Sequence, residues 1–154
     1  MATQQSAWAK GNRQTVRPQT AGAVHTQLFS FTCSANVETT DIIELGELMP
    51  FARVCDAIVF TEGTFTGITA DIGLMSGNFG DKDSVRTSGN ELFAAADLAA
   101  AGTAIVRLSK KDMLSLATTE ASRGIGVKVS AQVAGAATKK IHLLLSYYQT
   151  GETT

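Results

Sequence analysis

The sequence of 154 residues has few of the side chains on which enzymatic and metal-binding sites depend. It contains only two histidines, His25 and His142, and neither has a context that resembles a Ser-His-Asp or Cys-His arrangement. It also contains only two cysteines, Cys33 and Cys55, without a CxxC spacing. We therefore expect no enzyme activity, no cofactor and no metal site. We expect both cysteines to be reduced, buried thiols in apolar strands, with a disulfide as the alternative if those strands are neighbours.

Excess charge of one sign and long apolar runs are also missing. The formal net charge is −1 and the sequence pI is near 6.1, so no overall field favours nucleic acid or an anionic membrane surface. The longest apolar tract, residues 92–106, is interrupted by Asp97 and Gly102 and is shorter than the ~20 residues of a membrane-spanning helix. The first residues carry no apolar export signal. We expect a chain made in the cytoplasm that binds neither nucleic acid nor membrane.

One stretch, ADIGLMSGNFGDKD at residues 70–83, combines glycines and aspartates as ion- and phosphate-binding loops do. Its glycines match neither GxGxxG nor a Walker A sequence. An EF-hand loop that began at Asp81 would place Arg86 where the loop requires glycine. We therefore predict a strand end and a structured turn that bind neither calcium nor nucleotide, with Asp71 bonded to a backbone group or an arginine. A weaker cation contact by Asp81 and Asp83 remains open.

Alternation of apolar residues with a period of two predicts that most of the chain forms strands. The expected strands are residues 28–33, 41–48, 53–60, 65–75, 125–133 and 141–147. The short linker 134–138 predicts a hairpin between the last two strands. Alanine-rich and leucine-rich residues over 90–101 and 109–118 predict two short helical turns. The pattern indicates a mainly β fold, an antiparallel β-sandwich or jelly-roll-like domain with one or two short helices.

The first twenty-two residues are polar, and no acidic residue appears before Glu38. This composition predicts an extended basic N-terminal arm over residues 1–22 that becomes ordered on a partner. The arm precedes a single β-sandwich-like domain over residues 23–154. The residues expected to contact the capsid or another partner are Trp8, Lys10, Arg13 and Arg17.

Three sequence blocks occur in an order that resembles a known family. They are LGELMPFARVCDA at residues 45–57, DIGLMSGNFGD at 71–81 and GIGVK at 124–128. This progression resembles the head decoration, or cement, proteins of tailed bacteriophages, which are encoded beside the major capsid gene. The resemblance extends from about Asp41 to Tyr148 and contains no catalytic signature. It implies a β-rich protein on the outer capsid surface, commonly a homotrimer, with a dimer as the alternative.

The function implied by this resemblance is structural. It implies a virion protein, made in the host cytoplasm, that stabilises the phage head by bridging subunits of the major capsid protein. Several weak contacts made at once give firm attachment. The alternative is a ligand-binding β-sandwich, such as a carbohydrate-binding module or a phage adhesion accessory. Such modules present exposed aromatic rings, whereas only 6% of this sequence is aromatic and most of those residues lie in apolar runs.

Overall fold

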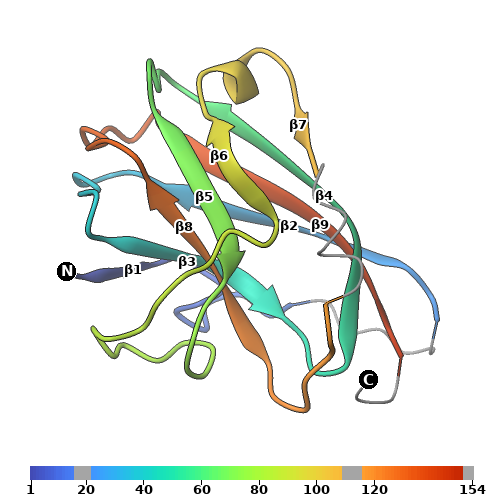
Figure 1. Cartoon of the computed structure of the whole chain (residues 1–154). Coiled ribbons are helices and arrows are strands. Elements are labelled where there is room, and N and C mark those ends of the chain that lie inside the picture. Colours follow the sequence, from blue (N-terminus) through green and yellow to red (C-terminus); the bar gives the residue numbers. More distant parts are fainter. Residues whose placement is uncertain (16–21, 109–115, 151–154) are drawn as a thin grey trace.

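The computed structural model describes residues 1–15, 22–108 and 116–150, and within them two β-sheets face each other (Figure 1). A 3-10 turn, η1 (Ala100–Gly102), precedes a short edge strand. The strands in chain order are β1 (Thr3–Gln5), β2 (His25–Thr32), β3 (Ile42–Leu48), β4 (Ala52–Glu62), β5 (Thr69–Leu74), β6 (Phe93–Asp97), β7 (Val106–Arg107), β8 (Arg123–Val129) and β9 (Lys140–Gln149). The predicted β-sandwich class is confirmed.

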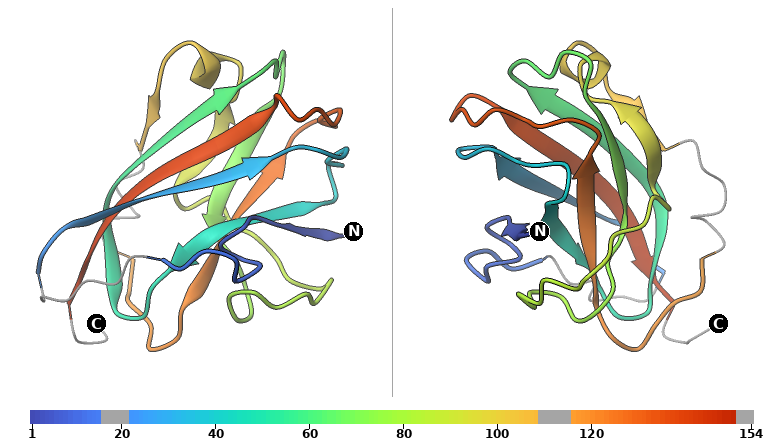
Figure 2. Two further views of the ribbon diagram at one scale, coloured as in Figure 1. Left: turned by 180° about the vertical axis from the view of Figure 1, so that it is seen from behind. Right: turned by 60° about the vertical axis from the view of Figure 1, so that its left-hand side comes forward.

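The strands divide unequally between the two layers. The five-stranded sheet has the order β1-β3-β8-β5-β6, and the four-stranded sheet has the order β2-β9-β4-β7. Only β1 and β3 pair in parallel; every other neighbouring pair among the described strands is antiparallel. Seen from behind, β2 and β9 cross in front of β5 and β8 (Figure 2, left). Both β1 and β2 are therefore edge strands, one in each sheet.

The core lies between the sheets, where alternate side chains of each strand point inward. On β9 the predicted apolar face is fully buried and consists of Ile141, Leu143, Leu145 and Tyr147. Ile125 and Val127 of β8 are also fully buried and face them from the other sheet. The period-two pattern thus identified the core face of both strands correctly.

The predicted hairpin between the last two long strands is wrong. β8 belongs to the five-stranded sheet and β9 to the four-stranded sheet, so the linker crosses between layers. Before the crossing, Val133 forms an isolated antiparallel bridge with Val37. A strand buries its inward-facing apolar residues whether the next strand along the chain lies in the same sheet or in the opposite one. Alternation alone therefore does not distinguish a hairpin from a crossing between the sheets.

The alanine-rich stretch predicted as a helical turn forms mainly a strand. β6 pairs with β5, and its Phe93 and Ala96 are buried against the core. Burial of these two side chains overrides the helix propensity of alanine, and only η1 retains a helical turn. Most of the second predicted turn, residues 109–118, lies outside the described residues. No helix in the described part of the chain is long and apolar enough to cross a membrane.

Candidate functional site

The N-terminal segment, residues 1–15, lies along the domain, which differs from the arm expected to order only on a partner. β1 pairs with β3, with Gln4 opposite Ile43. Trp8 is 7% exposed and meets the Phe29 ring edge to face, with centroids 5.4 Å apart. The Ser6 hydroxyl donates to the backbone oxygen of Leu45. Burial of the single tryptophan supplies apolar area that offsets the ordering of this segment.

The residues predicted to contact a partner separate into buried and exposed groups. The Trp8 ring is covered while the segment is docked, whereas Lys10 and Arg13 are exposed. The Arg13 guanidinium lies 5.2 Å from the centroid of the Trp8 ring, within the range of a cation–π interaction. Arg17 lies outside the described residues. Two of the four predicted contact residues are therefore accessible in the described segment.

Asp41 holds the beginning of the N-terminal segment on the sandwich. Its Oδ1 accepts from the backbone N–H of Ala2 at 3.0 Å, and its Oδ2 accepts from the Gln4 amide at 3.1 Å. The Glu38 backbone N–H donates to Oδ2 at 3.1 Å. Burial raises the pKa of this carboxyl, but these donors outweigh burial and hold the pKa of Asp41 below its ordinary value. The ionised form of Asp41 is therefore one of the contacts that hold the docked segment.

A groove with a volume of about 520 Å³ runs between the N-terminal segment and β2. Exposed Lys10 and Lys82 contribute the only charged side chains among the described residues that line it. The other lining residues are polar or small, with one aromatic, and comprise Thr3, Gln4, Gln5, Ser6, Ala7, Ser30, Phe31, Thr32 and Ser34. This groove joins the predicted basic segment to an edge of each sheet.

The loop that contains the glycine- and aspartate-rich stretch is anchored by a buried ion pair. Arg86 Nη2 lies 2.7 Å from Glu44 Oε1, and the two side chains are 2% and 0% exposed. Arg86 also donates to the backbone oxygens of Ser76 at 2.7 Å and Asp81 at 2.8 Å. The amide of Gln5 donates to the other Glu44 oxygen at 3.1 Å, which links β1 to the same anchor.

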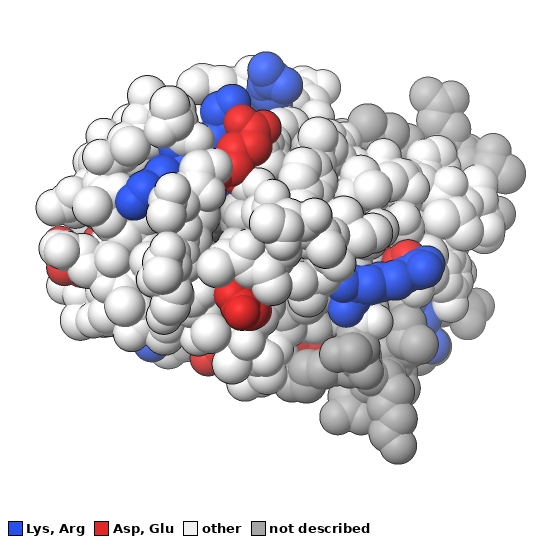
Figure 3. Space-filling view, turned by 90° about the horizontal axis from the view of Figure 1, so that it is seen from above, with Lys and Arg blue, Asp and Glu red and all other residues white. Residues whose placement is uncertain are grey.

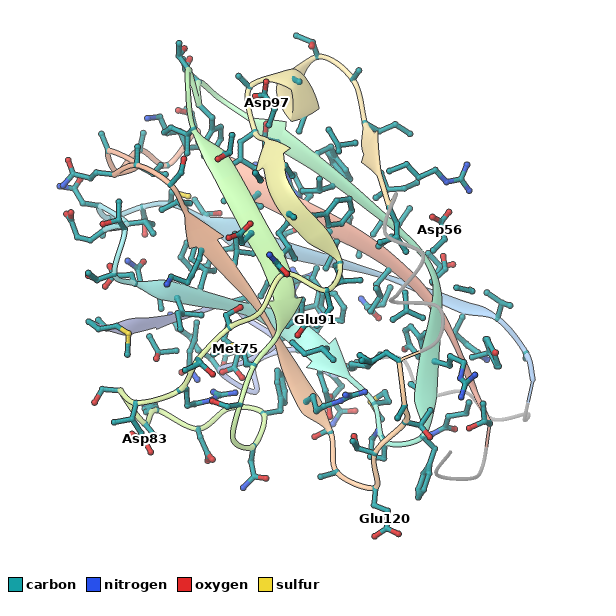
Figure 4. The ribbon with its side chains drawn as sticks, viewed as in Figure 1. Asp56, Met75, Asp83, Glu91, Asp97 and Glu120 are labelled. Atoms are coloured by element: carbon teal, nitrogen blue, oxygen red, sulfur yellow. The ribbon has the colours of Figure 1, made fainter. Side chains whose placement is uncertain are left out.

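Glycines on the outer face of the five-stranded sheet make room for this loop. A Cβ on Gly126 would lie 2.5 Å from Ser88 Oγ, and a Cβ on Gly73 would collide with the Glu91 carboxylate. Glu91, which lies over β5 in Figure 4, accepts from the backbone N–H of Leu74 at 2.8 Å. The DIGLMSGNFGD and GIGVK blocks therefore belong to one packing arrangement.

The aspartates of the stretch form local hydrogen bonds. Asp71 Oδ1 accepts from the backbone N–H of Ala95 at 2.8 Å, which confirms the predicted backbone bond. Asp83, at the loop tip in Figure 4, accepts from the Val85 N–H at 3.0 Å. The predicted turn is confirmed by Gly77, whose φ is 73°. The described residues contain no group of three or more potential metal ligands, and the lack of calcium and nucleotide binding stays a prediction.

His142 belongs to a cluster on the outer face of the four-stranded sheet that the sequence did not reveal. Although it lies on an outer face, it is only 7% exposed, and its ring stacks on Phe60 with centroids 4.7 Å apart. Its Nδ1 lies 2.7 Å from Ser30 Oγ, and its Nε2 lies 3.1 Å from Glu62 Oε1. Lys140 Nζ, 3.0 Å from Glu62, completes the cluster and lowers the carboxyl pKa. Both ring nitrogens are thus occupied.

The two cysteines differ in exposure, which corrects the expectation that both are buried. Cys33 is fully buried, and burial raises its pKa to about 11. Cys55 is exposed on β4, next to an irregularity in the pairing of β4 with β9. Because β9 lies between β2 and β4, the strands are not neighbours, and both cysteines are free.

Charge is distributed without a dominant sign on the face shown in Figure 3. Lysines and arginines alternate there with aspartates and glutamates among many uncharged side chains. Exposed Arg107 pairs with half-buried Asp56, with Nη2 and Oδ2 2.6 Å apart. The groove therefore differs from that face, since its charged lining is entirely positive among the described residues.

Comparison with known proteins shows which family the chain belongs to. No family model and no curated protein matches the sequence. A solved chain from the capsid of Ralstonia phage GP4 is 39% identical, with a TM-score of 0.82 over 96% of this chain and 98% of that chain. The protein belongs to this phage capsid-protein family. It is therefore a virion structural protein, which confirms the phage part of the resemblance.

Two more distant structures share the fold of this capsid-family protein. A chain of the cyanophage Pam1 capsid asymmetric unit is 18% identical, with a TM-score of 0.62 over 90% of this chain and 95% of that chain. A chain of the acid-stable capsid of Helicobacter pylori bacteriophage KHP30 is 13% identical, with a TM-score of 0.54 over 88% of this chain and 94% of that chain. The sandwich thus persists at low sequence identity.

Proposed function

We propose that this capsid-family protein is a head decoration protein that binds the outer capsid surface and bridges subunits of the major capsid protein. The observation that carries the proposal is the basic N-terminal segment, where Lys10 and Arg13 are exposed and Lys10 lines a groove between two sheet edges. Such a region can contact one subunit while other faces of the domain contact its neighbours. Several such contacts resist internal pressure together because all must break before the protein leaves. We further propose a homotrimer, with a dimer as the alternative.

The carbohydrate-binding alternative has less support. The large apolar side chains that are exposed in the described residues are Met1, Val24, Leu28, Val85 and Ile105. None of them is aromatic, whereas sugar recognition by stacking needs an accessible ring. Phe60 is already stacked on His142.

Heads assembled without this chain provide the test. A decoration protein is dispensable for assembly, so bare heads should form and bind added protein on their outer surface, as seen in an image reconstruction. Failure of heads to assemble would instead identify a subunit of the shell itself. Absence of binding to well-formed bare heads would also contradict the proposal.

The contribution of the basic segment is tested on the same heads. Replacing Lys10 and Arg13 with alanine should lower occupancy, whereas Lys128→Ala on the outer face of β8 should not. Occupancy of the wild type should fall as salt shortens the screening length from ~10 Å at 0.1 M to ~3 Å at 1 M. Occupancy that is unaffected by the substitutions and by salt would remove this segment from the attachment.

A further inference from the structure

The groove beside the N-terminal segment is bordered by one edge strand of each sheet. β1 ends the five-stranded sheet and β2 ends the four-stranded sheet, and residues of both line the groove. An open strand edge carries main-chain donors and acceptors that another extended chain can bond. The groove therefore combines a cavity with two rows of such groups.

Hydrogen-bond alternation shows which groups face the groove. Cys33 N–H donates to the Lys139 oxygen at 2.9 Å, so odd-numbered residues of β2 bond β9 and the main-chain N–H groups of Ser30 and Thr32 point outward. The Thr32 oxygen accepts from the Ser34 N–H at 2.9 Å. On the other side, Ser6 N–H donates to the Glu44 oxygen at 2.9 Å, so even-numbered residues there bond β3. Thr3 and Gln5 of β1 are thus also directed away from their sheet.

The lining of the groove defines the chemistry of its occupant. Lys10 and Lys82 are exposed, and the described lining contains no acidic side chain. The apolar side chains of the lining are Phe31, which is 9% exposed, and half-buried Ala7. An extended segment with alternating acidic and apolar side chains satisfies both features, because successive side chains of a strand point to opposite sides.

We propose that the groove receives an extended acidic segment of a neighbouring major capsid subunit, added as a strand to the free edge of β2. The proposal rests on the proposed decoration function and specifies its partner contact. β2 has eight residues and β1 has three, so β2 offers the longer row of main-chain partners. Main-chain bonds supply affinity in such strand addition, while Lys10 and Lys82 select negative side chains.

The isolated full-length protein tests this contact with a defined probe. The probe is a blocked hexapeptide that alternates glutamate with valine, and the control peptide has lysine in place of glutamate. Amide chemical shifts should change at Ser30 and Thr32 with the acidic probe and remain unchanged with the control. Shifts confined to other residues, or equal shifts with both peptides, would overturn the inference.

Variants separate the charge from the strand edge. The Lys10→Glu/Lys82→Glu double substitution should weaken probe binding at least about tenfold, and Lys128→Glu should leave it within about twofold. Thr32→Pro removes an outward N–H without breaking the β2–β9 pairing, so it should weaken binding as well. Unchanged binding by the charge-reversed protein would overturn the inference even if the proline variant failed to fold.

Bare heads distinguish failure of this inference from failure of the decoration function. Groove variants that occupy heads as well as the wild type would overturn the groove contact while leaving decoration intact. A wild-type protein that binds the acidic probe but not heads would instead contradict decoration and, with it, the capsid subunit as occupant. Self-association of the wild type that these variants abolish would assign the groove to a second copy of this chain.

Discussion

Cys33 and Cys55 show how the surroundings of a single residue determine its chemistry. The thiolate is the reactive form, and burial both covers Cys33 and raises its pKa to about 11. Cys55 is exposed. We predict that an alkylating reagent modifies Cys55 alone in the native protein and both cysteines after denaturation, as measured by peptide mass. Equal native labelling of the two, or a disulfide-linked mass, would contradict the structure.

The surroundings of the ion pair between Arg86 and Glu44 likewise determine how much that pair contributes to stability. Removing one partner of a buried pair leaves the other charge uncompensated, so Arg86→Met should lower the free energy of unfolding by about 3–5 kcal/mol. Adding Glu44→Leu to that variant should restore part of the loss. The matched control is Arg107→Met, because Arg107 is 70% exposed in its pair with Asp56 and the expected loss is at most about 1 kcal/mol. Urea denaturation measures the free energy of unfolding of all three variants. Equal losses of stability in Arg86→Met and Arg107→Met would contradict the role of the Glu44–Arg86 pair as a buried anchor.

At the scale of elements, the sequence predicted which residues form strands better than it predicted which strands pair. Alternating residues must face a core wherever their strand lies, so the core faces of β8 and β9 were predictable although their sheets were not. Charge identified Lys10 and Arg13, but the groove requires residues 3–7 and 30–34 to meet at two sheet edges. The Glu44–Arg86 anchor likewise joins residues 42 positions apart, and no local pattern indicates it.

The docking of the N-terminal segment on the sandwich gives a prediction at this scale. Trp8 is the only tryptophan in the sequence, so its fluorescence reports on this docking. Because the folded pKa of Asp41 is lowered, its stabilisation is fully present above the unfolded pKa of ~3.9 and is lost as pH falls through the folded pKa. Acidification should therefore shift Trp8 emission to the red before the circular dichroism of the sandwich changes.

Substitution of Asp41 distinguishes the release of the N-terminal segment from general acid unfolding of the domain. Asp41→Ala should produce the same red shift of Trp8 emission at neutral pH. The control is Asp97→Ala, since exposed Asp97 lies at the end of β6 and bonds the backbone of Ala99 and Ala100 (Figure 4). Simultaneous loss of the Trp8 signal and the sandwich signal, or an equal effect of both variants, would show that Asp41 does not hold the segment.

At the scale of the whole molecule, a filled sandwich core lies behind the groove that we propose as a binding surface. The two layers bury their apolar side chains against each other, and the basic groove opens where β1 and β2 end the sheets. Densely packed interiors have low compressibility, as the proposed bridging of capsid subunits requires. This is the physical basis for expecting the capsid-family protein to stabilise a head without catalysis.

The most direct test is the temperature at which packaged heads release DNA, measured for bare heads and for heads saturated with this protein. The proposed role predicts a higher release temperature for decorated heads, with a smaller increase when the added protein carries Lys10→Ala and Arg13→Ala at matched input concentration. Equal release temperatures for bare and fully decorated heads would contradict the claim that this protein stabilises the head.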